Sequence, residues 1–192
     1  MSCAGLFQGQ SVSCADPLSV GLVQRLFLAN LEDVASFTYD GTDANKVTAI
    51  AMKAGKLFYE FEGVKQSINV TSEYVPKPYS VAYKSTIDFS VFEVDAATRR
   101  NLEAMAFQKT IAITFGVNDT SLSDGAFEIH GIRAGLDVIT NVRIPSDNET
   151  GAAYRVQLAS PDAGGIETAL PYVFWDTDYD TTLAALVALK TV

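Results

Sequence analysis

Cysteine and histidine are scarce in this sequence, which disfavours several kinds of chemistry. The two cysteines, Cys3 and Cys14, both lie in the first fourteen residues, and His130 is the one histidine. No cysteine lies near His130 in the sequence, so a structural role for this histidine is favoured over a Cys/His catalytic pair. Cys3 and Cys14 either form a disulfide or remain free, and free thiols are favoured because a single pair in an N-terminal arm is more often free in a cytosolic protein.

Several functional signatures are missing as well. The sequence contains no G-x-S-x-G elbow, no phosphate-binding P-loop and no H-E-x-x-H zinc helix. We therefore expect no enzymatic activity and no cofactor. No apolar window is long enough to span a bilayer, and the N-terminus has neither a basic n-region nor a sustained apolar run. We expect no membrane association and no secretory signal peptide.

Basic residues are outnumbered by acidic ones. The chain has 14 Lys and Arg against 23 Asp and Glu, and its formal net charge is −9 at pH 7. Affinity for nucleic acid comes largely from basic side chains that neutralise phosphates, so we expect no sequence-specific binding of nucleic acid. An acidic wall repels phosphate, however, and a passage through which DNA slides remains compatible with this charge.

The most informative stretch runs from residue 86 to residue 117. In Thr86-Ile-Asp-Phe-Ser-Val91 apolar and polar residues alternate, which predicts a half-buried strand, and residues 110–117 repeat the alternation. Between these strands, residues 96–107 contain no Gly or Pro, and Asp95 precedes them as a candidate helix cap. The stretch therefore predicts a strand, one amphipathic helix and a second strand.

The remaining chain predicts more short strands separated by Gly and Pro turns. They are expected at residues 22–29, 34–39, 46–54, 56–62, 66–75, 126–132, 136–144, 153–159 and 170–175. We expect residues 46–54 and 56–62 to form a hairpin closed at Gly55. The predicted fold is mainly β: a β-sandwich or partly closed barrel of antiparallel strands with one flanking α-helix at about 95–107.

This pattern divides the chain into three parts. Residues 1–22 are predicted to be an extended N-terminal arm, because they are rich in Gly, Ser, Gln and Ala. Residues 23–175 form a single β-sandwich domain. Residues 176–192 form a C-terminal tail that is either a short helix capped by Asp180 or a final strand, since their periodicity fits both.

A proline-containing segment, Val75-Pro-Lys-Pro-Tyr79, interrupts one of these strands. Proline cannot donate to a central ladder, so the segment is predicted to be a stiff loop or a hairpin tip. A plain surface turn is one interpretation. The other is a contact with a neighbouring subunit, in which Tyr74, Pro76, Pro78 and Tyr79 act as rigid anchors.

Alternating carboxylates in Asp176-Thr-Asp-Tyr-Asp180 are similar to the start of a calcium-binding loop. Thr181 stands where such a loop needs glycine for its sharp turn, and Val187 stands where it needs a bidentate glutamate. A helix-loop-helix calcium site is therefore not expected. Asp176, Asp178 and Asp180 either form a looser cation site or belong to a solvated acidic turn.

The order of these elements resembles a known family. An N-terminal arm, a β-meander from about residue 22, the proline-containing loop, the segment Ile87-Asp-Phe-Ser-Val-Phe-Glu-Val-Asp, a helix at 96–107 and a strand at 111–117 look like the tail tube proteins of tailed bacteriophages. The tube proteins of contractile tails and type VI secretion are related to them. The resemblance spans roughly residues 22–175 and lies in element order and composition.

This resemblance implies a function without a catalytic residue. Family members are β-sandwiches whose subunits close into six-membered rings, and the inner strands of a ring form a continuous barrel. Stacked rings make a tube through which DNA is ejected. The implied partners are copies of the same chain and other tail or virion proteins, and the implied location is the virion, after synthesis in the bacterial host cytoplasm.

Other functions remain open at this point. The chain is alternatively another virion structural protein of the neck, capsid or minor tail. A soluble β-sandwich that binds a carbohydrate or a cation is a rival of a different class, and such a module would be monomeric.

Overall fold

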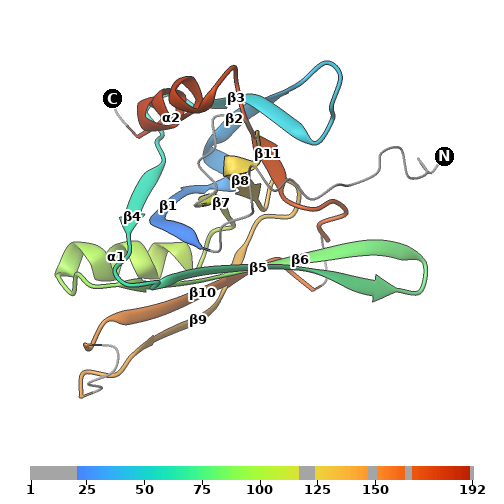
Figure 1. Ribbon diagram of the computed structural model, residues 1–192. Coiled ribbons are helices and arrows are strands. Elements are labelled where there is room, and N and C mark those ends of the chain that lie inside the picture. The colour runs from blue at the N-terminus through green and yellow to red at the C-terminus, as the bar shows by residue number, and fades with distance from the viewer. Residues whose placement is uncertain (1–20, 117–123, 147–150, 163–165, 191–192) are drawn as a thin grey trace.

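Two stacked β-sheets form the body of the molecule in the computed structural model (Figure 1). The structure describes residues 21–116, 124–146, 151–162 and 166–190. Nearly all of the predicted N-terminal arm, with Cys3 and Cys14, lies outside the described residues, as does most of the polar loop that follows residue 116. The predicted pairing of the two cysteines therefore stays a prediction.

The larger sheet has seven strands in the order β2-β3-β11-β8-β7-β1-β4. Their bounds are β1 (Leu22–Asn30), β2 (Val34–Tyr39), β3 (Lys46–Met52), β4 (Tyr59–Glu62), β7 (Thr110–Gly116), β8 (Phe127–His130) and β11 (Tyr172–Phe174). Their pairing is antiparallel except between β11 and β3, which are parallel. Two short 3-10 helices, η1 (Leu31–Asp33) and η2 (Asp124–Ala126), lie before β2 and β8.

The smaller sheet has four antiparallel strands in the order β5-β6-β10-β9. Their bounds are β5 (Ile68–Lys77), β6 (Ser80–Val91), β9 (Asp137–Arg143) and β10 (Tyr154–Ala159). The two sheets are not closed into a barrel. The predicted β-sandwich with a flanking helix is confirmed.

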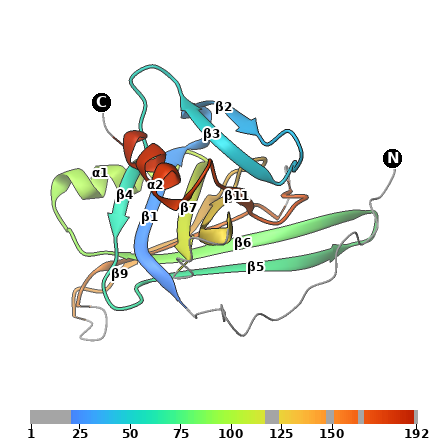
Figure 2. The same cartoon turned by 45° about the horizontal axis from the view of Figure 1, so that its top comes forward.

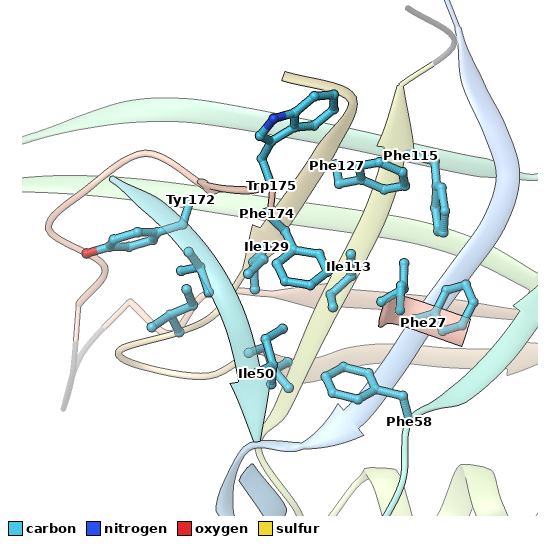
Figure 3. Close-up of a cluster of buried hydrophobic side chains, with 14 of the residues drawn as sticks. Phe27, Ile50, Phe58, Ile113, Phe115, Phe127, Ile129, Tyr172, Phe174 and Trp175 are labelled. Carbon is cyan, nitrogen blue, oxygen red and sulfur yellow. The ribbon is translucent and has the colours of Figure 1, made fainter. Parts of the chain in front are cut away.

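Two hydrophobic cores lie on opposite faces of the larger sheet. Strands β1 and β7 contribute to both: Phe27 and Ile113 point into one core, while Leu28 and Ala112 point into the other. The first core is rich in aromatic side chains, which converge in Figure 3. The second is enclosed by the smaller sheet. Because β7 is buried on both faces, it is a central strand and not the half-buried one that its alternation predicts.

Helix α1 (Ala96–Met105) flanks the second core. Leu102 and Met105 are buried there, and the Asp95 carboxylate accepts a hydrogen bond from the backbone N–H of Thr98 at 2.7 Å. This bond satisfies one of the free N–H groups of the first turn and lowers the pKa of Asp95. The predicted helix and its cap are present, although the helix ends at Met105 and not at residue 107.

Helix α2 (Tyr179–Ala188) covers the first core. Leu186 is fully buried, and Leu183 and Leu189 pack around it. The C-terminal segment is therefore helical at its centre and belongs to the body of the molecule. Its cap is Asp178 and not Asp180, because the Asp178 carboxylate accepts from the backbone N–H of Thr181 at 2.7 Å.

The predicted hairpin closed at Gly55 is wrong. Gly55 does adopt a positive φ of 71° in a turn, but β3 pairs with β2 and β11, whereas β4 pairs with β1. Phe58 provides the physical reason, because it leaves the turn to bury its ring in the first core. Its backbone N–H donates to the carbonyl of Leu189 at 3.0 Å, which ties the segment to the end of α2.

Candidate functional site

A long hairpin of β5 and β6 projects from one end of the molecule. β6 pairs with β10 up to Thr86, and its Tyr83 still forms a bridge to Glu167, whose carbonyl accepts from the Tyr83 backbone N–H at 2.9 Å. The three steps from Tyr83 to the start of β6 at Ser80 cover about 10 Å at the usual rise of a strand. Figures 1 and 2 both place the turn of this hairpin far from helix α1. The end of the hairpin therefore forms a short arm that extends beyond these contacts with its own subunit.

The four predicted contact residues gather at this tip. The sequence predicts that proline interrupts this strand, but the pairing continues: β5 runs through Pro76, which lies opposite Val81. β5 is an edge strand, and an edge tolerates a missing N–H donor. Pro78 and Tyr79 form the turn, as expected for a hairpin tip, and Tyr79 is fully exposed. Tyr74 is mostly exposed, and its ring meets that of Tyr83 edge-on with centroids 5.8 Å apart.

Sequence reasoning missed two members of this tip. Val81 is 47% exposed, and Tyr83 supports Tyr74 from the opposite strand. The signal was present in the spacing of Val81 and Tyr83, which continues the period of two toward the proline segment. The tip thus presents apolar and aromatic groups on a stiff backbone, and Lys77 is the one charged residue between Tyr74 and Val81.

The outward face of the smaller sheet is polar. One cross-strand row runs over all four strands through Asn69, Asp88, Gln157 and Thr140. The Gln157 amide donates to the Asp88 carboxylate at 2.8 Å. The positive charge of Arg155 on the same face offsets the negative charge of Asp88. A shallow hollow of about 460 Å³ lies over this row. The centre of the face is therefore rich in hydroxyl and amide groups and carries little net charge.

Both edges of the smaller sheet are open in the described part of the chain. β5 pairs there with β6 alone, and β9 pairs with β10 alone. Along and just beyond β9, Ile139, Val142 and Ile144 are all about half exposed. An open edge with apolar side chains is a template for pairing with another chain, and proteins that stay monomeric usually protect such edges.

His130 is buried between the two sheets and is not accessible to a substrate. Its Nε2 shares a 3.0 Å hydrogen bond with the Thr114 hydroxyl, and its Nδ1 shares one of 3.3 Å with the hydroxyl of Ser85 on β6. Burial lowers the pKa of His130 to about 4 and raises that of Glu128, whose carboxylate lies 3.7 Å away. Both shifts favour the uncharged forms. The adjoining hollow of about 10 Å³ has room for at most one water.

The aspartates after Trp175 act mainly in local hydrogen bonds. Asp178 caps α2, and the Asp176 carboxylate accepts from the Thr177 hydroxyl at 3.2 Å. The described residues contain no group of three or more His, Cys, Asp and Glu side chains placed to hold a metal ion.

Comparisons with protein-family models, with curated proteins and with solved structures find no match to this chain. Within the described ranges, neither helix is long and apolar enough to cross a bilayer.

Proposed function

We propose that this protein is a structural subunit that assembles with copies of itself into rings, and that stacked rings form the tail tube of a bacteriophage. The observation that carries the proposal is the pair of open edges on the smaller sheet. Edge β9 of one copy can pair with edge β5 of the next, which would bury Ile139 and Val142 and satisfy unpaired backbone groups. Because the two edges differ, this contact is heterologous and generates a ring when the rotation closes.

The polar face of the smaller sheet is suited to form the inner wall of a conduit. In a closed ring the row through Asn69, Asp88, Gln157 and Thr140 would continue from subunit to subunit around the wall. This face presents hydroxyl and amide groups with little net charge, and the chain is acidic overall. The face therefore offers no array of basic side chains to which DNA phosphates could bind. DNA would therefore pass along such a wall without being retained. No catalytic residue is needed, and the location that follows is the virion, with synthesis in the bacterial host cytoplasm.

Electron microscopy and size-exclusion chromatography of the purified protein test the proposal. We expect rings or tubes. Ile139→Lys combined with Val142→Lys should abolish them, because charges on an edge strand prevent pairing. Ala51→Lys is the control, since Ala51 is exposed on β3 of the larger sheet, away from both edges of the smaller sheet. A monomer at every concentration, or assembly that survives the two lysines on β9, would contradict the proposal.

The hollow on the polar face favours one alternative, a soluble module that binds a carbohydrate or a cation. Ligand pockets are mostly lined by apolar and aromatic groups, whereas the one aromatic ring of this hollow, Phe89, is buried. A binding module should remain monomeric, and its melting temperature should rise with sugars or calcium. Neither ligand should change the melting temperature of a tube subunit.

A further inference from the structure

A groove between β4 and α1 lies at the end of the molecule opposite the hairpin tip (Figure 1). It consists of two adjoining hollows of about 560 and 160 Å³, and Tyr59, Phe61 and Asn101 line both. Small-molecule pockets of about 300–1,000 Å³ hold groups as large as several side chains. The groove is therefore large enough for the tip of a hairpin.

The lining of the groove includes apolar and acidic side chains. Tyr59, Val64 and Phe92 line it and are each about half exposed. Glu93 also lines it and forms no ion pair with a described residue. Glu60 differs from Glu93, because Arg25 and Lys190 both bind its carboxylate. An uncovered apolar surface next to an unpaired carboxylate fits an occupant that is apolar and carries a positive charge.

The groove also includes an open strand edge. β4 ends the larger sheet and pairs only with β1 among the described strands. An extended segment entering the groove could therefore add backbone hydrogen bonds to β4.

We propose that the β5–β6 hairpin tip of one copy of this chain binds the groove between β4 and α1 of the next copy. This inference rests on the proposed self-assembly and names the two surfaces that meet. Tyr74, Tyr79 and Val81 supply the apolar groups, and Lys77 supplies the positive charge that complements Glu93. Pro76 and Pro78 stiffen the tip, so less conformational entropy is lost on binding.

The position of the two surfaces excludes binding within one subunit. Both views place the turn of the hairpin and helix α1 at opposite ends of the same molecule. A tip that fits a groove on a different surface makes a head-to-tail contact, which propagates until it closes into a ring or extends as a filament.

Disulfide cross-linking between copies tests the contact directly. In a background with Cys3→Ser and Cys14→Ser, a chain carrying both Tyr79→Cys and Asn101→Cys should give a ladder of covalent oligomers on oxidation. An equimolar mixture of the two single variants should give covalent dimers between them and nothing larger. Both positions are exposed, so neither change should disturb folding. Tyr79→Cys combined with Ala51→Cys is the control and should give no ladder, because Ala51 lies on β3, outside the groove.

A charge exchange provides an independent readout. Lys77→Glu and Glu93→Lys should each raise the concentration needed for assembly by roughly three- to fivefold, as expected for loss of one partly exposed ion pair. The two changes in one chain should restore assembly. Glu103→Lys makes the same change of charge on an exposed position of α1 outside the groove lining and should have little effect.

The outcomes separate the two proposals. Assembly without the Tyr79–Asn101 cross-link, or without rescue by the charge exchange, overturns the hairpin contact and leaves the proposed ring function standing. A protein that never assembles overturns both.

Discussion

At the scale of single residues, His130 is a buried side chain that connects the two sheets. It bonds to Thr114 in the larger sheet and to Ser85 in the smaller one. Ser85 is in turn held by Ser160, whose hydroxyl accepts from the Ser85 backbone N–H at 3.1 Å. A buried polar network of this kind fixes how the sheets pack, provided that each member stays hydrogen-bonded.

We predict that the protein loses stability in mild acid through His130. Burial lowers its pKa from 6.5 to about 4, so between these values the unfolded chain binds a proton that the folded chain does not. The free energy of unfolding should therefore fall as the pH decreases from 6.5 toward 4, by about 3 kcal/mol in total. Urea unfolding measured at a series of pH values checks this.

His130→Gln is the matched variant for this prediction. Glutamine is polar and of similar size but does not titrate, so the decrease between pH 6.5 and 5 should be largely absent. An unchanged pH dependence in this variant would assign the effect to other groups.

At the scale of elements, α2 closes the aromatic core and is anchored at both ends. Its start is capped by Asp178. Near its end, Lys190 binds Glu60 of β4, which Arg25 of β1 also binds. Burial alone would raise the pKa of Glu60, but these two hydrogen bonds outweigh it and lower the pKa. The helix therefore locks β4 to the body of the molecule.

We predict that Leu186→Ala destabilises the protein by about 2–5 kcal/mol. Leu186 lies on the buried side of α2 and is fully buried, so its truncation removes apolar contacts and leaves a cavity. Leu170→Ala is the control, because Leu170 is 55% exposed, and it should change stability by less than about 0.5 kcal/mol. Equal effects of the two substitutions, measured by denaturant unfolding, would show that α2 does not contribute to the core.

A second prediction concerns the acidic segment before α2. The backbone N–H of Thr181 binds the Asp178 carboxylate and lowers its pKa, whereas the Asp176 carboxylate accepts from Thr177 and Asp176 reaches the helix through its backbone N–H, which a substitution by alanine retains. Asp178→Ala should therefore lower the melting temperature by a few degrees, and Asp176→Ala should have a smaller effect. If the segment binds a cation instead, calcium should raise the melting temperature of the parent protein and of neither variant.

Local sequence patterns predicted helices and strands better than they predicted which strands pair. The alternation in residues 86–91 and the cap at Asp95 predicted β6 and α1 because both signals lie within a few neighbouring residues. β4 pairs with β1, which lies more than thirty residues away in the sequence, and such a pairing leaves no local signal. The predicted hairpin at Gly55 was wrong for this reason. The groove between β4 and α1 was missed for the same reason, since its walls come from distant segments.

At the scale of the whole molecule, exposed apolar groups gather at three places. They are the hairpin tip, the β9 edge and the groove beside α1. The sequence predicted the first through its prolines, but a strand edge and a groove exist only once the sheets have formed. This distribution is typical of a subunit with neighbours on several sides.

The dual role of β1 and β7 also has a consequence for how the protein melts. Since each strand forms a wall of both cores, neither core can open while the other stays closed. A calorimetric scan should give a single heat-absorption peak, and amide protons of Ile113 and Phe89 should exchange with deuterium at similarly slow rates. Two separate peaks would mean that the wall is not shared.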